Sequence, residues 1–174
     1  GERGVDFTER CFSPLAYRDA VADAVRRYKF RPVRAYAVPF GAIMSQCLQD
    51  HLPEGADLIT WCPLSKKRLR ERGFDQAELL ARVVGKACDV PVMGTLKKVK
   101  HTQPQSGLDE ESARRANARG AYLVLPGCDL TGKRVVLVDD VVTSGATLSE
   151  CAGLLRMAGA ERVHVLTLAL ARWD

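Results

Sequence analysis

Apolar and polar residues alternate along this chain in a way that predicts strands and helices in turn. Val135 to Val138 are four consecutive aliphatic residues, and a run that is apolar on both faces is typical of a strand covered on both sides in a parallel sheet. This strand is expected over 133–138. Further strands are expected over 56–61, 92–99, 121–125 and 163–169.

Apolar residues at helical spacing separate these strands. Ser13-Pro14 has the pattern of a cap followed by a first-turn proline, and predicts a helix from there to about residue 29. Asp75 and Glu78 have the spacing of a capping box and predict a helix over 75–88. Other helices are expected around 40–48, over 109–117 after a polar loop over 100–108, and from about 148 to a stop at Gly159. Strands that alternate with helices indicate an α/β fold.

Length and composition limit the class of protein. The chain has 174 residues, 47% hydrophobic and 27% charged, which is typical of a soluble globular protein. We expect a single domain over 1–174, with an N-terminal helical segment at about 13–52 and a core at about 56–174. The longest uncharged stretch, 35–49, contains Pro39 and Gly41 and is shorter than the about 20 apolar residues that span a bilayer. No membrane insertion is therefore expected.

The cysteines suggest a reducing compartment. The chain has six, far below the roughly 8–10% of a disulfide scaffold, and no two form a C-x-x-C pair. We interpret them as reduced thiols, with neither disulfides nor a zinc site expected in this chain. The N-terminus has no basic-then-apolar leader. We therefore expect a cytoplasmic protein.

Charge is unevenly distributed. The net charge is +5, and Lys and Arg exceed Asp and Glu most clearly between residues 61 and 119. Such a concentration favours a polyanionic ligand, either phosphate groups or nucleic acid, although a solvated basic face is a simpler explanation.

The strongest chemical signal follows the aliphatic strand. Asp139 and Asp140 come directly after it, where ligands bind in open α/β sheets. A small, hydroxyl-rich turn then leads into a helix, whose first N–H groups and partial positive charge suit a phosphate. The residues of this turn are Thr143, Ser144, Gly145, Ala146 and Thr147. Beside a sugar phosphate, the two carboxylates could accept hydrogen bonds from ribose hydroxyls or approach a hydrated Mg²⁺. The plain alternative is a strand-end turn that the two acids merely cap.

This run resembles the phosphoribosyl pyrophosphate (PRPP) signature of the type I phosphoribosyltransferases. A second region resembles the ComF family of competence-associated proteins, through its block Arg72-Gly73-Phe74-Asp75-Gln76, and Tyr28-Lys29-Phe30 matches that family's Lys-Phe motif. The chain departs from the family at Trp61-Cys62, where Pro-Val is usual, and at Asp75, where Asn is usual. Many members also carry an N-terminal four-cysteine zinc module, and this chain retains only Cys11 of it.

The resemblance implies a type I phosphoribosyltransferase-like, Rossmann-like parallel sheet flanked by helices, with a flexible hood loop over 97–108. It implies that 143–147 bind the 5′-phosphate of PRPP, and that Asp139 and Asp140 bind the ribose and, through water, the Mg²⁺ that accompanies PRPP. The residues implied for pyrophosphate are Ser65, Lys66, Lys67 and Arg68. The hood residues implied to face the site are Lys98, Lys100, His101 and Gln105.

Two functions follow from this resemblance. The first is an enzyme, a Mg²⁺-dependent pentosyltransferase that binds PRPP or a nucleoside monophosphate. The sequence does not identify its acceptor, but we expect it not to be a 6-oxopurine, because Thr143 stands where the similar 6-oxopurine salvage enzymes place an aspartate. The second is a non-catalytic adaptor in DNA uptake that binds a helicase-type ATPase and single-stranded DNA. Aromatic residues are not interleaved with the basic ones, which weakens a base-stacking surface, and no helix-turn-helix indicates a transcription regulator.

Overall fold

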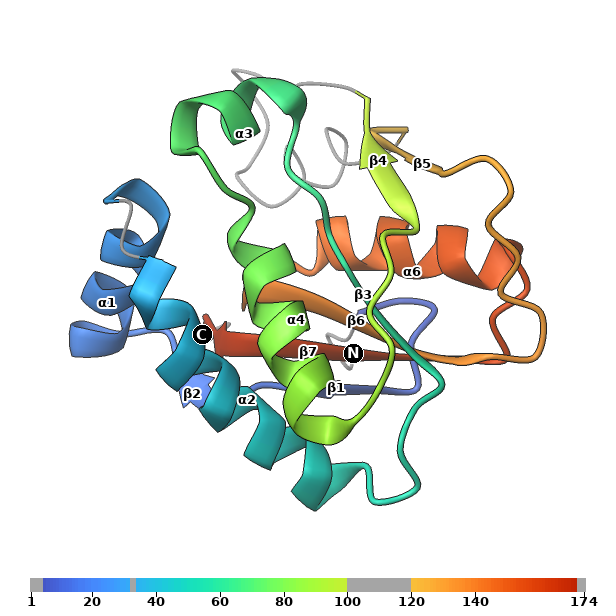
Figure 1. Cartoon of the computed structure of the whole chain (residues 1–174), viewed down its shortest axis with the longest axis horizontal. Coiled ribbons are helices and arrows are strands. Elements are labelled where there is room, and N and C mark those ends of the chain that lie inside the picture. Colours follow the sequence, from blue (N-terminus) through green and yellow to red (C-terminus); the bar gives the residue numbers. More distant parts are fainter. Residues whose placement is uncertain (1–4, 32–33, 100–119, 172–174) are drawn as a thin grey trace.

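The computed structural model describes residues 5–31, 34–99 and 120–171 (Figure 1). Its central sheet is parallel, with strand order β1-β7-β6-β3 and a short β2 that also pairs with β7. The strands are β1 (Arg10–Phe12), β2 (Leu15–Ala16), β3 (Leu58–Trp61), β6 (Arg134–Val142) and β7 (Arg162–Leu170). A separate antiparallel pair is formed by β4 (Leu96–Lys98) and β5 (Tyr122–Val124).

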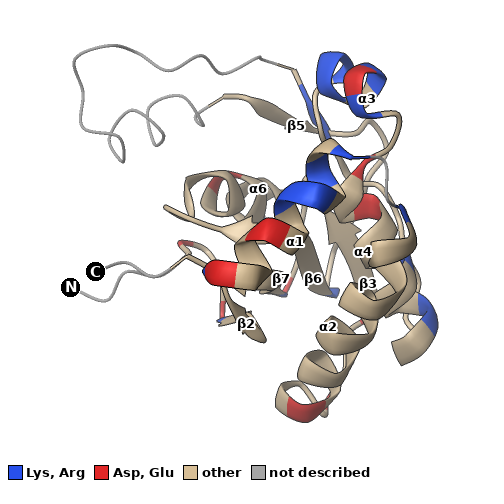
Figure 2. Cartoon of the chain, turned by 90° about the vertical axis from the view of Figure 1, so that its left-hand side faces the viewer, with Lys and Arg blue, Asp and Glu red and all other residues tan. Residues whose placement is uncertain are grey.

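Helices cover both faces of the sheet. Figure 2 shows the strands between α6 on one side and α2 and α4 on the other. The helices are α1 (Asp19–Phe30), the 3₁₀ turn η1 (Arg34–Tyr36), α2 (Ala37–His51), α3 (Lys66–Arg72), α4 (Gln76–Cys88) and α6 (Ala146–Met157). These layers confirm the expected parallel α/β architecture flanked by helices.

Strand β6 divides the hydrophobic core into two clusters. Val135 and Leu137 pack with residues of α6, whereas Val136 and Val138 pack with residues of α1, α2 and α4. All four side chains are fully buried. Because successive side chains of a strand point to opposite faces, this aliphatic run packs against the helices on both faces of the sheet, as its sequence predicted.

Helices α2 and α4 pack closely because one contact residue has no side chain. A Cβ atom added to Gly41 of α2 would lie 2.3 Å from Cγ1 of Val83 in α4. Helix α4 begins at an effective cap, since Oδ1 of Asp75 accepts hydrogen bonds from the N–H groups of Ala77 (3.0 Å) and Glu78 (3.3 Å). The N-cap at Asp75 is confirmed, whereas Oε1 of Glu78, the other member of the expected capping box, accepts from Arg82.

Some expectations need correction. The helix expected from Ser13-Pro14 begins only at Asp19, because Leu15 and Ala16 are extended and pair with Ala169 and Leu170 of β7. Strand β6 continues through both aspartates to Val142 rather than ending before them. The other expected strands and helices are present with shifted ends, while the loop expected over 100–108 and the helix over 109–117 lie outside the described residues.

All six cysteines are free thiols, as expected. Within the described ranges, no helix has the length and apolar character that a bilayer crossing requires.

Candidate functional site: the carboxyl edge of β3 and β6

The turn between β6 and α6 brings small residues and a glycine N-cap to the start of α6. Gly145 caps α6 with φ of 76°, a left-handed conformation that favours glycine. Ser144 Oγ lies 3.4 Å from the N–H of Ala146, which donates to it. Thr143 is exposed and Thr147 is half-buried, so the turn is accessible from solvent. The first N–H groups of a helix have no partner within it, and here they lie directly behind this turn.

Asp139 lies on the same side of the sheet as α6. Its Oδ1 accepts a hydrogen bond from the N–H of Asp140 at 2.8 Å. Burial removes the carboxylate from water and raises its pKa well above the usual range, and the negative charge of Asp140 adds to this rise. A hydroxyl donor or a cation brought by a ligand would favour the ionised form that the protein alone disfavours.

Asp140 lies on the other side, against α1 and α4. It is only 4% exposed. Its Oδ2 is 3.1 Å from Nζ of Lys29 and accepts a hydrogen bond from Nε2 of Gln76 at 3.2 Å, while its Oδ1 accepts one from the N–H of Val141 at 2.6 Å. Asp140 therefore forms an ion pair in this structure, with both carboxylate oxygens engaged.

The turn after β3 lies beside the two aspartates. Strands β3 and β6 are parallel neighbours with Trp61 opposite Val138, and the N–H of Cys62 donates to the carbonyl of Val138 at 3.0 Å. Asp75 holds the turn from behind, because its Oδ2 accepts from the N–H of Leu64 at 2.9 Å. The same carboxylate thus caps α4 and positions this turn.

The four residues implied for pyrophosphate have different environments. Ser65 is 8% exposed and acts as the N-cap of α3, accepting from the N–H of Arg68 at 3.3 Å. Its hydroxyl therefore has a structural partner. Lys66, Lys67 and Arg68 are exposed on α3. Figure 2 shows basic residues on α3 and at the adjacent end of α1.

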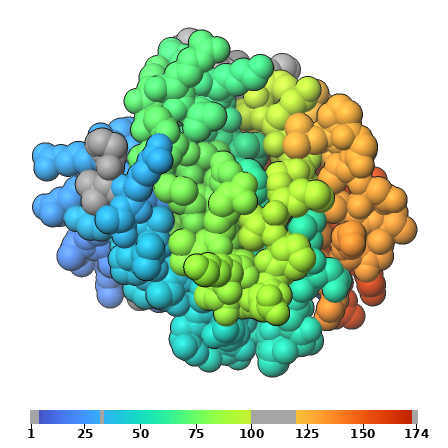
Figure 3. Space-filling model, in the orientation of Figure 1, coloured from blue at the N-terminus to red at the C-terminus, as the bar shows by residue number. Residues whose placement is uncertain are grey.

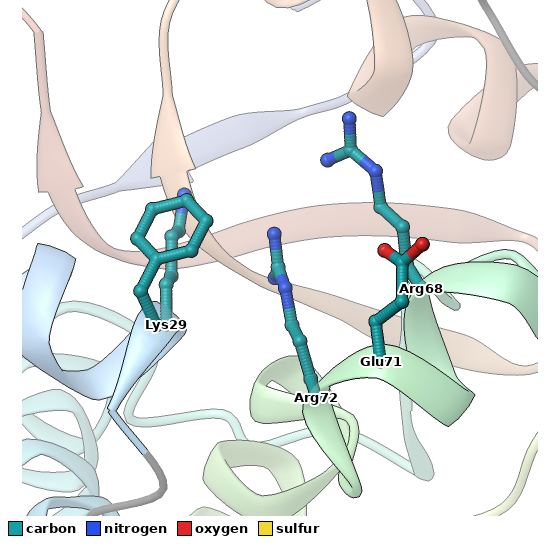
Figure 4. Close-up of a pocket in the computed structure, with 5 residues that line it drawn as sticks. Lys29, Arg68, Glu71 and Arg72 are labelled. Atoms are coloured by element: carbon teal, nitrogen blue, oxygen red, sulfur yellow. The ribbon is translucent and has the colours of Figure 1, made fainter.

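A basic pocket of about 400 Å³ opens between α1 and α3. In Figure 3 the blue surface of α1 lies beside the green surface of α3 and α4. The residues that line the pocket are Lys29, Phe30, Arg68, Glu71 and Arg72. Arg68 and Arg72 project from α3 in the same direction, toward the side on which Lys29 lies (Figure 4). Among the described residues that line it, three cations face a single acid, which suits the pocket to an anion.

Arg72 is the most constrained of these cations. Its guanidinium carbon lies 5.2 Å from the centre of the Phe30 ring. Nη1 is buried, and no hydrogen-bond acceptor reaches it among the described residues. Burial lowers the pKa of Arg72, as does the positive charge of Arg68, although the negative charge of Asp140 opposes the shift. An anion in the pocket would satisfy this donor.

The strands at the base of the predicted hood bring one of its residues to the site. Nζ of Lys98 in β4 is 5.3 Å from the centre of the Tyr122 ring in β5. Burial lowers the pKa of Lys98, and the charge of Arg68 lowers it further, whereas Asp139 opposes the shift. The pKa of Lys98 therefore depends on the charges of both Arg68 and Asp139, which indicates that Lys98 lies near the site. Lys100, His101 and Gln105 lie outside the described residues.

Three residues of this site had no role assigned from sequence: Lys29, Arg72 and Gln76. Each belongs to a motif that the sequence displays, Lys29 to Tyr28-Lys29-Phe30 and the others to the Arg-Gly-Phe-Asp-Gln block. The signal was thus present, but only the fold brings the two motifs to Asp140. Elsewhere in the described ranges, no group of three or more His, Cys, Asp or Glu residues could hold a metal ion.

Comparison with known proteins agrees with this geometry. The phosphoribosyl transferase domain model matches residues 69–172, which includes β6, the turn at 143–147 and α6. This chain belongs to the phosphoribosyltransferase domain family. Its sheet and flanking helices have the type I phosphoribosyltransferase fold, as the resemblance implied.

Individual relatives identify a narrower group within this family. The chain is 33% identical over 161 residues to Competence protein F of Haemophilus influenzae. The matched region covers 89% of this chain and 70% of that protein. The chain is 26% identical over 167 residues to Competence protein ComFC of Streptococcus pneumoniae, covering 96% of this chain and 70% of that protein. The chain is therefore a ComF-like phosphoribosyltransferase-type protein.

A solved structure shares the fold. The glutamine PRPP amidotransferase of B. subtilis, solved with ADP and GMP, superposes with a TM-score of 0.50 and 24% sequence identity. The match covers 76% of the ComF-like chain and 26% of the amidotransferase chain. It extends the likeness in fold beyond the competence proteins.

Proposed function

We propose that this ComF-like chain binds PRPP at the carboxyl edge of its sheet and transfers the phosphoribosyl group with release of pyrophosphate. The observation that carries the proposal is the arrangement of two anion-binding features around one acid pair. The glycine turn at 143–147 follows Asp139 and Asp140 closely in the chain, and the basic pocket contains Lys29, which pairs with Asp140. PRPP has the matching order of groups, with a ribose between a phosphate and a pyrophosphate.

Each group then has a role in the transfer. The bond from ribose C1 to the pyrophosphate oxygen breaks, the acceptor's lone pair forms the new bond to C1, and the acceptor's proton leaves to solvent or a base. The turn at 143–147 fixes the 5′-phosphate and Asp139 holds a ribose hydroxyl, so that C1 is positioned for attack. Arg68 and Arg72 offset the charge that accumulates on the departing pyrophosphate. When bound with the substrate, Mg²⁺ adds positive charge at the same leaving group.

Calorimetry with Mg²⁺ and PRPP tests the binding step. We expect saturable binding that weakens at least about tenfold when Asp139→Asn and Asp140→Asn are combined, which is a loss of about 1.4 kcal/mol. Asp89→Asn is the matched control, because Asp89 ends α4 in a left-handed conformation that Asn also adopts. Equal binding by all three proteins would contradict the proposal. Pyrophosphate release with a panel of bases and amines then tests catalysis.

A second candidate is a PRPP-binding adaptor in competence without transferase activity. The names of the relatives favour it, as do the exposed basic residues Lys66, Lys67 and Arg70 on α3. Such an adaptor would bind a DNA-uptake ATPase and single-stranded DNA. Firm PRPP binding without pyrophosphate release, together with DNA binding that weakens steeply as salt is raised, would favour the adaptor over the enzyme.

A further inference from the structure

Lys29 belongs to both halves of the proposed site, which are the ribose half around Asp140 and the basic pocket. Its Nζ pairs with Oδ2 of Asp140 at 3.1 Å, and the same side chain lines the basic pocket. The lysine side chain is 24% exposed and the carboxylate only 6% exposed, so the cation is the partner with access to solvent. Figure 4 shows Lys29 reaching from α1 across from the arginines of α3.

The ion pair occupies the carboxylate that the proposed function assigns to ribose. Oδ2 of Asp140 already has two donors, Nζ of Lys29 and Nε2 of Gln76, and Oδ1 has the N–H of Val141. A carboxylate oxygen accepts about two hydrogen bonds in the usual geometry. Oδ2 is thus fully used, and a ribose hydroxyl binds this oxygen only after one of its two donors withdraws.

The basic pocket offers Lys29 an alternative position. Arg68 and Arg72 line the pocket with only Glu71 to balance them, and Nη1 of Arg72 is buried with no acceptor in the described part of the chain. An anion that enters would attract the third cation of the pocket as well. Lysine is suited to such a move, because its ammonium is a point charge on a flexible four-carbon stem.

We propose that Lys29 couples the two halves of the site. An anion of the diphosphate class in the basic pocket draws the ammonium of Lys29 away from Asp140, which becomes available to a ribose hydroxyl. This inference rests on the proposed function, because it takes Asp140 as a ribose ligand. Without the anion, a ribose hydroxyl that binds Oδ2 of Asp140 has to displace Lys29 itself. Ligands of the two halves therefore bind with positive coupling, and by linkage each raises the affinity of the other by the same factor.

Calorimetry with two separate probes measures this factor. One probe is inorganic pyrophosphate with Mg²⁺, and the other is 1-deoxyribofuranose 5-phosphate, which has no hydroxyl at C1 and so leaves room for the first. Each is titrated alone and in the presence of the other at saturation. For the unsubstituted chain we expect each probe to raise the affinity of the other about fivefold or more.

Two variants break the pair from opposite sides. Lys29→Met keeps most of the stem but removes the charge, and Asp140→Asn removes the acid that holds it. In both, the coupling factor should fall to about one. Arg27→Met is the matched control, since Arg27 is an exposed cation of the same helix that does not line the pocket, and it should keep the factor. Thermal unfolding checks that each variant is folded, and one folded variant is sufficient for the test.

The outcomes separate the two proposals. Binding of both probes to the unsubstituted chain without mutual enhancement overturns the role of Lys29 and leaves PRPP binding standing. Coupling that persists in a folded Lys29→Met or Asp140→Asn variant overturns it as well. Binding of neither probe overturns the proposed function itself, and the role of Lys29 with it.

Discussion

Asp139 and Asp140 are adjacent in β6, yet their carboxylates lie on opposite faces of the sheet. Asp140 pairs with Lys29 on the face covered by α1 and α4. Asp139 is on the α6 face, where its charge acts on Lys98 and Tyr122. Two identical side chains in sequence thus have unlike surroundings, and their substitution should have unlike effects.

Asp140→Asn should destabilise the fold. The substitution removes the anion that compensates Lys29, whose side chain is mostly buried. A buried charge that loses its partner lowers the stability of the folded state. We expect the free energy of unfolding to fall by about 1–2 kcal/mol at neutral pH. Urea denaturation measures this, with Asp89→Asn as the control that should change little. An unchanged midpoint would show that the ion pair adds nothing to stability.

Asp139→Asn should instead raise the free energy of unfolding, by an amount that depends on pH. The folded state raises the pKa of Asp139, chiefly through burial. The contribution of the Asp139 carboxyl to stability is therefore fully present below the pKa of an unfolded aspartate, about 4, and is lost as pH rises through the raised value. An amide does not ionise, so the variant escapes this loss. Its advantage in urea denaturation should grow from about pH 4 to about pH 7, and an advantage independent of pH would contradict the burial of this carboxyl.

Asp75→Asn tests how the turn after β3 is held. Oδ2 of Asp75 accepts from Leu64 and Oδ1 caps α4, so both oxygens are used. An amide can serve only one of these functions with its single oxygen. We expect the free energy of unfolding to fall by about 1 kcal/mol, together with weaker pyrophosphate binding. Asp57→Asn, in a surface ion pair with Arg134 at the opposite edge of the sheet, should leave pyrophosphate binding unchanged. Unaltered binding in the Asp75 variant would show that the turn does not require this carboxylate.

Gly41→Ala tests the contact between α2 and α4. The added methyl group would overlap Val83 at 2.3 Å, and overpacking of this kind costs about 1–3 kcal/mol. Val83→Ala removes the overlapping atoms, so the double variant should recover most of the stability that Gly41→Ala loses. A double-mutant cycle by urea denaturation measures this coupling. Additive effects would mean that the two helices separate rather than clash.

Much of the fold was predictable because its signals are local. The aliphatic run Val135–Val138, the Asp75 cap and the glycine turn before α6 each determine their structure within a few residues. The helix expected from Ser13-Pro14 is present as α1, but its expected start was wrong because β7, from the other end of the chain, pairs with Leu15 and Ala16. Periodicity within a short window carries no information about such a partner.

The candidate site was predictable only where it is continuous in sequence. The turn at 143–147 and the acid pair were found together, since the chain places them side by side. Lys29 and Gln76 reach Asp140 from α1 and α4, and no spacing rule links these three residues. Helix α3 was also missed, because its run of charged residues has no apolar period and is stabilised instead by the Ser65 cap. Ser65 Oγ accepts a hydrogen bond in that cap, which leaves its O–H as a donor, so its contact with pyrophosphate stays a prediction.

The most direct test is a crystal structure of this chain with Mg²⁺ and PRPP. We predict the 5′-phosphate on the N–H groups of the turn at 143–147, the ribose beside Asp139 and the pyrophosphate toward Arg68 and Arg72. PRPP bound elsewhere on the molecule, or bound with its phosphates away from both the turn and the basic pocket, would contradict the account.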